Sequence, residues 1–270
     1  MIIEVKPKSP FRVPVEAECI TPEKIKGYIQ GEKMEVWEGN RKRNIENLFD
    51  IKLKENDDSK VELLLKGDFT KVKRIGAGMT SGSIIIQGNA GMHLGEGMKG
   101  GSIKVLGNVD SWVGGMMEGG SIEVMGNAKD YVGATYRGSR NGMKGGLIII
   151  HGNAGNEVGC YMRGGLVCIH GNAGQFLGIH MMGGTLLVYG DCDDRVGAEM
   201  TDGKIIICGR VRSILPTFTI EDIKSKVKVD GEKITGPFYL FRGDLAEEGN
   251  GRLYVSKVKN PHLSFYEELL

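Results

Sequence analysis

One 19-residue unit of the chain reads Gly107-Asn108-Val109-Asp110-Ser111-Trp112-Val113-Gly114-Gly115-Met116-Met117-Glu118-Gly119-Gly120-Ser121-Ile122-Glu123-Val124-Met125, and the next unit opens at Gly126-Asn127. Seven near-copies occupy the sequence from about residue 75 to residue 210. They align on one glycine, called here the anchor glycine: Gly82, Gly101, Gly120, Gly146, Gly165, Gly184 and Gly203. The step between anchors is 19 residues, except for 26 residues between Gly120 and Gly146. A fixed period of this length is typical of stacked repeat architectures.

Four positions of the repeat are apolar in every copy. In the quoted unit they are Ile122 and Val124 after the anchor, and Met117 and Val113 before it. The alternation after the anchor predicts a strand with one buried face. A single coil cannot bury four such side chains, but coils stacked about 4.8 Å apart would pair their strands and enclose one core. We therefore expect an all-β fold, a right-handed parallel β-helix of about seven coils.

A Gly-Asn pair follows most of the predicted strands, as at Gly107-Asn108 and Gly126-Asn127, with Gly190-Asp191 and Gly209-Arg210 as variants. We expect the glycines to adopt positive φ at corners, and the asparagines to hydrogen-bond backbone groups of their own or the next coil. All seven prolines lie outside the array, where their missing N–H removes no bond from a strand ladder.

Three segments follow from this pattern: a small mixed α/β N-terminal cap (1–74), the β-helix array (75–212) and a C-terminal extension packed on the β-helix (213–270). In the cap we expect a helix that begins after Thr21 and ends near Tyr28, a turn over Glu55–Lys60, and strands at Val13–Cys19, Met34–Trp37, Leu48–Leu53 and Val61–Leu65. In the extension we expect a short helix near Ile220–Lys226, a hairpin turn at Val229–Glu232 and the apolar run Pro237–Phe241.

The composition excludes several kinds of partner. The net charge of +1 gives no basic excess for nucleic acid, and no apolar run approaches the roughly 18 residues of a membrane span. The first residues carry charges where a signal peptide is apolar, so we expect a cytoplasmic protein. Five cysteines without a C-x-x-C pair predict reduced thiols and no iron–sulfur cluster in this chain.

The outward-facing positions change along the array. Three residues after the anchor, the side chain is charged at Lys104 and Glu123 but apolar at Ile149, Leu187 and Ile206. One residue after the anchor, serine gives way to leucine at positions 147 and 166. An apolar outer face must be covered, either by the chain's own C-terminal segment or by another protein. The candidate partner interface is therefore Leu147, Ile149, Leu166, Leu187 and Ile206.

The long step between anchors contains an insertion, residues 134–142, where the other copies have two residues. Insertions in repeat proteins form loops on one face and often bind partners. Tyr136, Arg137 and Arg140 are therefore candidate contacts to a partner or an anionic ligand, and the alternative is a solvated loop.

No residues are predicted to be catalytic, cofactor-binding or metal-ligating. His151 and His170 stand at equivalent positions in successive coils, where a metal is geometrically possible, but a pair without a third ligand is more typical of a surface or an interface. The methionine column is interpreted as core filling.

The pattern Gly-Asn-Ala-Gly…Val-Gly…Met-x-Gly-Gly-x-Ile-x-Val-x-Gly-Asn resembles the β-helix domain at the C-terminus of the glutamate synthase large subunit. As a separate chain with a short cap, the sequence resembles the C-type subunit of formylmethanofuran dehydrogenase. This resemblance implies a non-catalytic scaffold in a complex that reduces CO2 and forms formylmethanofuran, the first step of methanogenesis. It also implies an amidohydrolase-like subunit, pterin–metal subunits and ferredoxin-like subunits as partners. A tungsten- or molybdenum-pterin, iron–sulfur clusters and a dinuclear metal site would then lie in those subunits, and no cofactor in this chain.

Two alternatives remain open at this point. The C-type subunit of a methylotroph formyltransferase/hydrolase complex is similar and works without CO2 reduction, and a glutamate-synthase-type domain would have a structural role. A polysaccharide-acting solenoid enzyme lacks the stacked charged groove that it would need, and a hexapeptide-repeat acyltransferase needs a period divisible by six.

Overall fold

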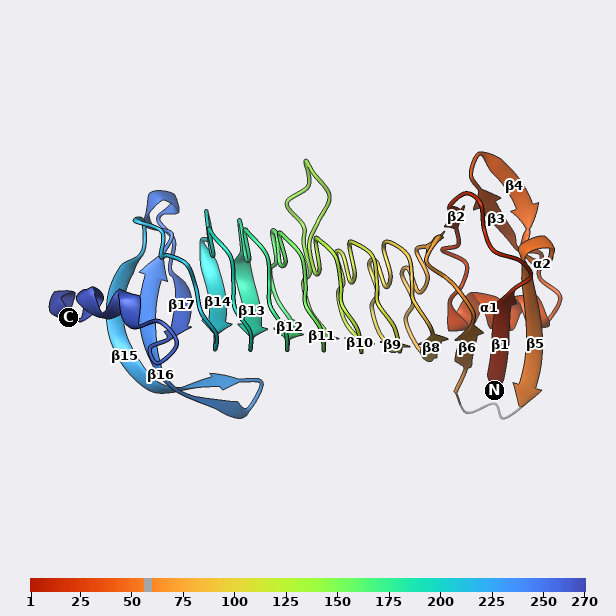
Figure 1. Cartoon of the computed structure of the whole chain (residues 1–270). Coiled ribbons are helices and arrows are strands. Elements are labelled where there is room, and N and C mark those ends of the chain that lie inside the picture. Colours follow the sequence, from red (N-terminus) through yellow and green to blue (C-terminus); the bar gives the residue numbers. More distant parts are fainter. Residues whose placement is uncertain (56–59) are drawn as a thin grey trace.

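The computed structural model describes residues 1–55 and 60–270. A 13-stranded sheet runs along an elongated molecule, in the order β15-β16-β17-β14-β13-β12-β11-β10-β9-β8-β6-β1-β5, and a four-stranded sheet lies at the N-terminal end (Figure 1). The repeat supplies the central strands: β8 (Ser83–Gln87), β9 (Ser102–Val105), β10 (Ser121–Val124), β11 (Leu147–Ile150), β12 (Leu166–Ile169), β13 (Met182–Val188) and β14 (Asp202–Ile207). The expectation of a mostly β fold rich in parallel strands is confirmed.

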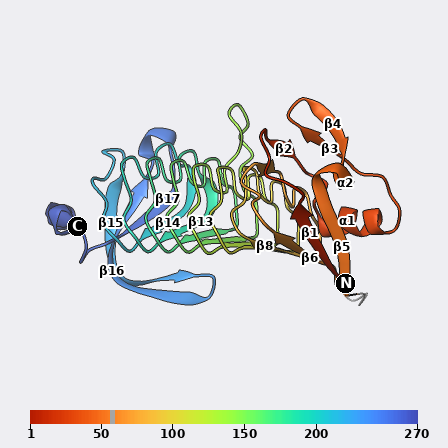
Figure 2. The same cartoon turned by 45° about the vertical axis from the view of Figure 1, so that its right-hand side comes forward.

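Equivalent positions of successive repeats pair in register. Ile122 of β10 pairs in parallel with Ile103 of β9 on one side and with Ile148 of β11 on the other. On the opposite limb of each turn, single parallel bridges join equivalent residues, such as Ala90 to Val109 and Val109 to Ala128. The turns therefore stack on two limbs, as the successive loops of Figure 2 show.

The sheet continues beyond both ends of the repeat. β6 (Glu62–Lys66) pairs in parallel with β8, and β1 (Ile2–Pro7) pairs in parallel with β6. β5 (Phe49–Glu55) closes that edge in the antiparallel direction. At the other end β17 (Gly251–Ser256) pairs in parallel with β14. Strands from residues 1–74 and 213–270 thus extend the sheet that the array begins.

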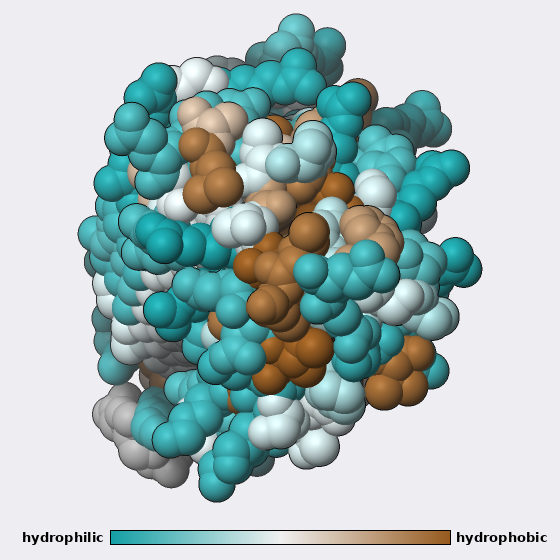
Figure 3. Space-filling view, turned by 90° about the vertical axis from the view of Figure 1, so that its left-hand side faces the viewer, coloured by the Kyte–Doolittle hydropathy of each residue, from teal (hydrophilic) through white to brown (hydrophobic). Residues whose placement is uncertain are grey.

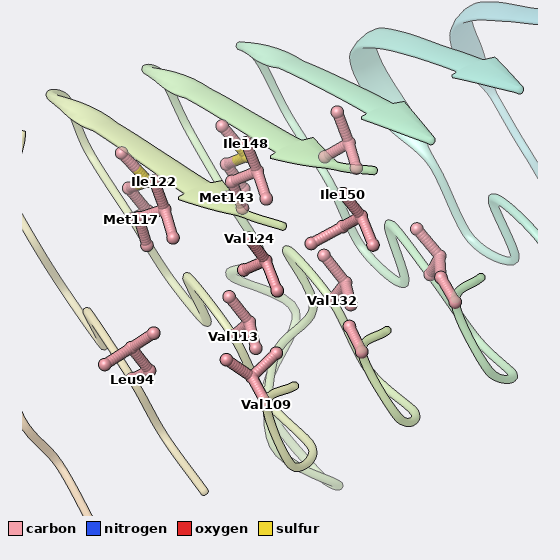
Figure 4. Packing of buried hydrophobic residues seen from close by; sticks show 14 of the residues in the cluster. Leu94, Val109, Val113, Met117, Ile122, Val124, Val132, Met143, Ile148 and Ile150 are labelled. Carbon is pink, nitrogen blue, oxygen red and sulfur yellow. The ribbon is translucent and has the colours of Figure 1, made fainter. Parts of the chain in front are cut away.

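The core runs along the inside of the stack. Met117, Ile122 and Val124 are fully buried, and Figure 4 shows them packed against their counterparts in neighbouring turns. The equivalent methionines are all at most 1% exposed: Met79, Met98, Met143, Met162, Met181 and Met200. A fifth buried position, which the sequence pattern does not single out, is formed by the bridge residues Ala90, Val109, Ala128, Ala154, Ala173 and Cys192.

The anchor glycines are explained by both conformation and packing. All seven have φ between 78° and 105°, a region that favours glycine. A Cβ on Gly146 would also lie 2.7 Å from the Met117 Cε and 2.8 Å from the carbonyl oxygen of Gly120. The methionine column of one turn therefore fills the space that the anchor glycine of the next turn leaves open.

At the Gly-Asn corners the expectation for the asparagines is confirmed, whereas the expectation of positive φ for the glycines is wrong at most positions. Gly88 has φ 154°, but the five equivalent glycines from Gly107 to Gly190 are not in the positive-φ region. They are required by close approach, since a Cβ on Gly107 would lie 2.5 Å from the Asn89 Oδ1. That oxygen accepts a hydrogen bond from the Asn108 backbone N–H at 2.8 Å. The same bond repeats up the stack through Asn108, Asn127, Asn153, Asn172 and Asp191.

The N-terminal segment forms a second sheet in the order β4-β3-β2-β7: β4 (Arg41–Asn44), β3 (Glu35–Glu38), β2 (Val15–Glu16) and β7 (Val72–Lys73). The expected helix is α1 (Pro22–Ile29), and the Thr21 hydroxyl caps it by accepting from the Lys24 N–H at 3.3 Å. α2 (Ile45–Leu48) was not predicted. The turn expected over Glu55–Lys60 falls mainly on residues 56–59, outside the described residues.

The C-terminal segment contains β15 (Thr219–Val229), β16 (Glu232–Gly243) and the 3₁₀ helices η1 (Leu245–Glu247) and η2 (Pro261–Leu269). The helix expected near Ile220–Lys226 is wrong, because these residues lie in β15. The strand pairs antiparallel with β16 and buries Ile220 and Val227. The predicted turn at Val229–Glu232 is confirmed as the tip of this hairpin.

The end of the molecule that carries η2 has apolar surface, which Figure 3 shows as a brown area among hydrophilic residues. The exposed large apolar side chains that follow β17 are Val258, Phe265, Leu269 and Leu270. Within the described ranges, no helix has the length and apolar character needed to cross a membrane.

Candidate partner-binding surfaces

The β15–β16 hairpin covers part of the apolar outer face. Leu187 and Ile206 are 3% and 0% exposed beneath the hairpin residues Val227, Phe238 and Leu240. The Lys204 Nζ also donates to the Lys228 carbonyl at 3.0 Å, which ties the sheet to the hairpin. At these two candidate interface positions the cover is the chain's own C-terminal segment, the first of the two alternatives left open by the sequence.

The hairpin covers the remaining apolar candidates less completely. Leu147, Ile149 and Leu166 are only partly buried. A hollow of about 330 Å³ lies between the tip residues Val229 and Asp230 and the side chains of Leu147 and Leu166. Leu166 packs against the edge of the hairpin's apolar cluster, so this strip is a partly covered continuation of the face that the hairpin buries.

The insertion at residues 134–142 projects from the stack as the long loop at β10–β11 (Figure 1). Tyr136 turns back along the array, where its hydroxyl donates to the Glu96 Oε1 at 2.8 Å and accepts from the Arg74 Nη2 at 3.2 Å. The same hydroxyl lies 3.2 Å from the His93 Nδ1. Burial and the hydrogen bond to Glu96 raise the pKa of the Tyr136 phenol, so the hydroxyl stays protonated and able to donate. Tyr136 is thus held by the chain itself.

Both arginines of the insertion are exposed. A hydrogen bond with Tyr131 and the charge of Glu157 raise the pKa of Arg137. Arg163 of the next turn is also exposed, and its Nε donates to the Arg140 carbonyl at 3.1 Å. The structure therefore adds Arg163 to the charged surface that the sequence placed at Arg137 and Arg140.

The predicted histidine pair forms part of a ring ladder. The ring centroids of His151 and His170 are 4.9 Å apart, and those of His170 and Tyr189 are 5.1 Å apart. The His151 Nε2 lies 2.9 Å from the Glu123 Oε1, and burial lowers the pKa of His170. Over residues 1–55 and 60–270, no three His, Cys, Asp or Glu side chains are grouped to hold a metal ion.

A second column of stacked rings lies next to the insertion, and it was not predicted from the sequence. His93, Trp112 and Tyr131 stack with centroids 5.2 and 4.5 Å apart, and all three have φ between 61° and 67°. The Tyr136 ring lies 5.4 Å from His93 and 6.5 Å from Trp112. The stacking of His93 and Trp112 could have been predicted from the sequence, because both residues stand eight residues before their anchor glycines.

The architecture is mostly β with a large sheet rich in parallel strands, and its candidate sites are side chains on the surface of the repeats. No family model matches the sequence. The chain is 47% identical over 90 residues to the C-type subunit of molybdenum-containing formylmethanofuran dehydrogenase 1 from Methanothermobacter wolfeii, which is 33% of this chain and 22% of the relative. It is 42% identical over 89 residues to the C-type subunit of tungsten-containing formylmethanofuran dehydrogenase 2 from Methanococcus maripaludis, 32% of each chain. The match thus spans about a fifth to a third of the length of these relatives.

A solved structure resembles nearly the whole chain. It is the X-ray crystal structure of the formyltransferase/hydrolase complex (FhcABCD) from Methylorubrum extorquens in complex with methylofuran. One of its chains superposes with a TM-score of 0.82 and 28% sequence identity, covering 94% of this chain and 99% of that chain. The resemblance to the C-type subunit of formylmethanofuran dehydrogenase, stated from the repeat, is confirmed by these homologues.

Proposed function

We propose that this chain is a non-catalytic scaffold, the C-type subunit of a formylmethanofuran dehydrogenase complex that reduces CO2 and forms formylmethanofuran. The carrying observation is that the homologues are named as the C-type subunits of molybdenum and tungsten formylmethanofuran dehydrogenases. The structural likeness to a chain of a multi-chain complex over 94% of this sequence supports the same role.

The finer architecture is part of this proposal. We infer a right-handed parallel β-helix of about seven coils at 75–212, between a cap at 1–74 and an extension at 213–270. The in-register parallel strands at a 19-residue step and the bridges on the opposite limb support it. Stacked repeats present an extended surface along which several subunits can bind.

The proposed partners are an amidohydrolase-like subunit, pterin–metal subunits and ferredoxin-like subunits, with the tungsten or molybdenum, iron–sulfur and dinuclear metal sites in those chains. The apolar strip of Leu147, Ile149 and Leu166, and Arg137 and Arg140 of the insertion, are the surfaces we assign to them. Neither nucleic acid nor membrane is proposed as a partner, and the expected cytoplasmic location stays a prediction.

A second candidate is the equivalent subunit of a formyltransferase/hydrolase complex that does not reduce CO2. The likeness to a chain of the Methylorubrum complex favours it, because this match extends over nearly the whole of both chains. The two candidates share the scaffold role and differ in the chemistry of the partners.

Isolation of the tagged protein from its source organism tests both proposals. Co-purification with subunits that contain tungsten or molybdenum and iron–sulfur clusters is the result expected for the dehydrogenase. Formyltransferase and hydrolase subunits without pterin metal would point to the second candidate. Stoichiometric metal that stays with this chain after its separation from the partners would contradict a non-catalytic scaffold.

A further inference from the structure

The insertion, residues 134–142, is called the arm here, and it is fixed at both ends. On its N-terminal side Thr135 is 5% exposed, and the Tyr136 hydroxyl contacts His93 and Glu96 of the second repeat and Arg74 at the end of the N-terminal segment. On its C-terminal side the Gly142 N–H donates to the Tyr161 carbonyl at 3.0 Å. Arms held this way lose little conformational entropy when a partner binds them.

The Tyr136 site extends into the N-terminal segment. The Arg74 Nη1 lies 3.4 Å from the Glu96 Oε2, and the Arg74 Nε lies 3.3 Å from the Glu16 Oε2 in β2. Glu96 is nearly buried, with 10% of its side chain exposed, so its charge needs these partners. One phenol therefore connects the arm to the second repeat and, through Arg74, to the smaller sheet.

The fixed arm displays positive charge without a direct ion pair among the described residues. Across the described residues, Arg137, Arg140 and Arg163 are exposed and form no ion pair with a carboxylate within 4.0 Å. The lysines on either side differ, since Lys129 pairs with Asp110 at 3.0 Å and Lys144 with Glu118 at 3.0 Å. Glu157 acts on Arg137 from a distance, while its Oε1 accepts from the Tyr131 hydroxyl at 3.2 Å.

A hollow of about 210 Å³ lies beside Arg137, and Glu157 also lines it. Arg137, Tyr131, Tyr161 and His180 contribute to its lining, and the Tyr161 and His180 rings stack 4.4 Å apart. Arginine and tyrosine beside a small aromatic hollow are the residue types that most often contribute binding energy at protein interfaces. The hollow has room for one side chain from a partner.

We propose that the arm is a preorganised docking element for an acidic surface of a partner subunit, with Arg137, Arg140 and Arg163 as its contacts and Tyr136 as a positioning residue. This inference rests on the proposed role as a subunit of a multi-chain complex. Carboxylates of the partner supply the direct ion pairs that these arginines lack among the described residues, and the fork of each guanidinium can bind a carboxylate in bidentate fashion.

The test uses the assembled complex and measures the dissociation constant of this chain from its partners at several salt concentrations. R137E/R140E is expected to weaken assembly about tenfold or more at low salt and to flatten the salt dependence, because repulsion replaces attraction. The matched control is R12E/R41E, the same charge change at exposed positions of the N-terminal segment, which is expected to assemble like the wild type. Equal effects of both double variants would overturn the proposal.

Tyr136→Phe separates positioning from contact. It is expected to weaken assembly several-fold in the wild-type background. In an R137A/R140A background it is expected to cause no further loss of affinity, because Tyr136 then has no arginine contacts to position. Additive losses in the two backgrounds would contradict the positioning role. Circular dichroism of each variant checks that the stack stays folded.

Two further outcomes are distinguishable. In the first, sulfate or citrate binds the isolated chain, and R137E/R140E abolishes that binding but leaves assembly unchanged. The ligand is then a small anion, and the acidic partner surface is refuted. If the wild-type chain joins no complex, the proposed function fails, and the docking role fails with it.

Discussion

Replacing Gly146 by alanine tests the stacking of the repeats at one anchor glycine. At φ 91° an alanine is strained by about 1–2 kcal/mol. Its Cβ would also meet the Met117 Cε at 2.7 Å and the Gly120 carbonyl oxygen at 2.8 Å, and relieving such overpacking costs about 1–3 kcal/mol. The sum predicts a loss of about 2–5 kcal/mol in the free energy of unfolding.

Gly97 provides the matched control. It also has positive φ, at 61°, but a Cβ there would meet no atom within 4 Å. The equivalent positions carry Met116, Tyr161 and His180 at φ 54–57°, so side chains fit this part of the turn. Gly97→Ala should lose only the strain of about 1–2 kcal/mol. Urea unfolding followed by circular dichroism measures both, and equal losses would refute packing of methionine against the anchor glycine.

Three other changes have expected outcomes. Leu187→Glu buries a charge under the hairpin and should cost about 3–5 kcal/mol by thermal unfolding, whereas Ile149→Glu at the partly covered strip should keep the fold; equal melting would contradict the hairpin cover. Asn127→Ala removes the acceptor of a 2.7 Å backbone bond and should cost about 0.5–1.5 kcal/mol, while Asn127→Asp, which keeps an acceptor, should cost less; the same urea assay would disprove this if the two were alike. Burial raises the pKa of Glu23, but bonds from Thr80 and Ser81 outweigh it and lower that pKa from 4.5 to about 2. The stability due to Glu23 should therefore be complete above pH 4.5 and lost as the pH falls toward 2. If Glu23→Gln and the wild type had the same dependence of unfolding free energy on pH, this role of Glu23 would be refuted.

The repeat made the central sheet predictable. Identical spacing of Ile103, Ile122 and Ile148 from their anchors implies in-register pairing, which is the pairing observed. The C-terminal hairpin was harder, because Ile220–Lys226 mixes apolar and charged residues in a pattern that fits a helix as well as a strand. Only the pairing partner in β16 and the apolar face beneath decide between the two, and neither is local in sequence.

The candidate site was predictable in part. The position of the insertion and the charges of Arg137 and Arg140 follow from the sequence. The direction in which Tyr136 turns does not, because its partners Arg74, His93 and Glu96 lie 40 to 62 residues away in the chain. The sequence left open whether the chain itself or another protein covers Leu187 and Ile206. An apolar outer face indicates that it is covered, but it does not indicate which segment or protein covers it.

The size at which the chain elutes from a native extract tests the central claim most directly. The extract is separated by size-exclusion chromatography, and each fraction is tested for this chain by immunodetection and for formylmethanofuran formation by an activity assay. Our account predicts that the chain and the activity elute together at the size of an assembly of several subunits. Elution of the chain alone at the size of a monomer, with the activity in other fractions, would contradict it.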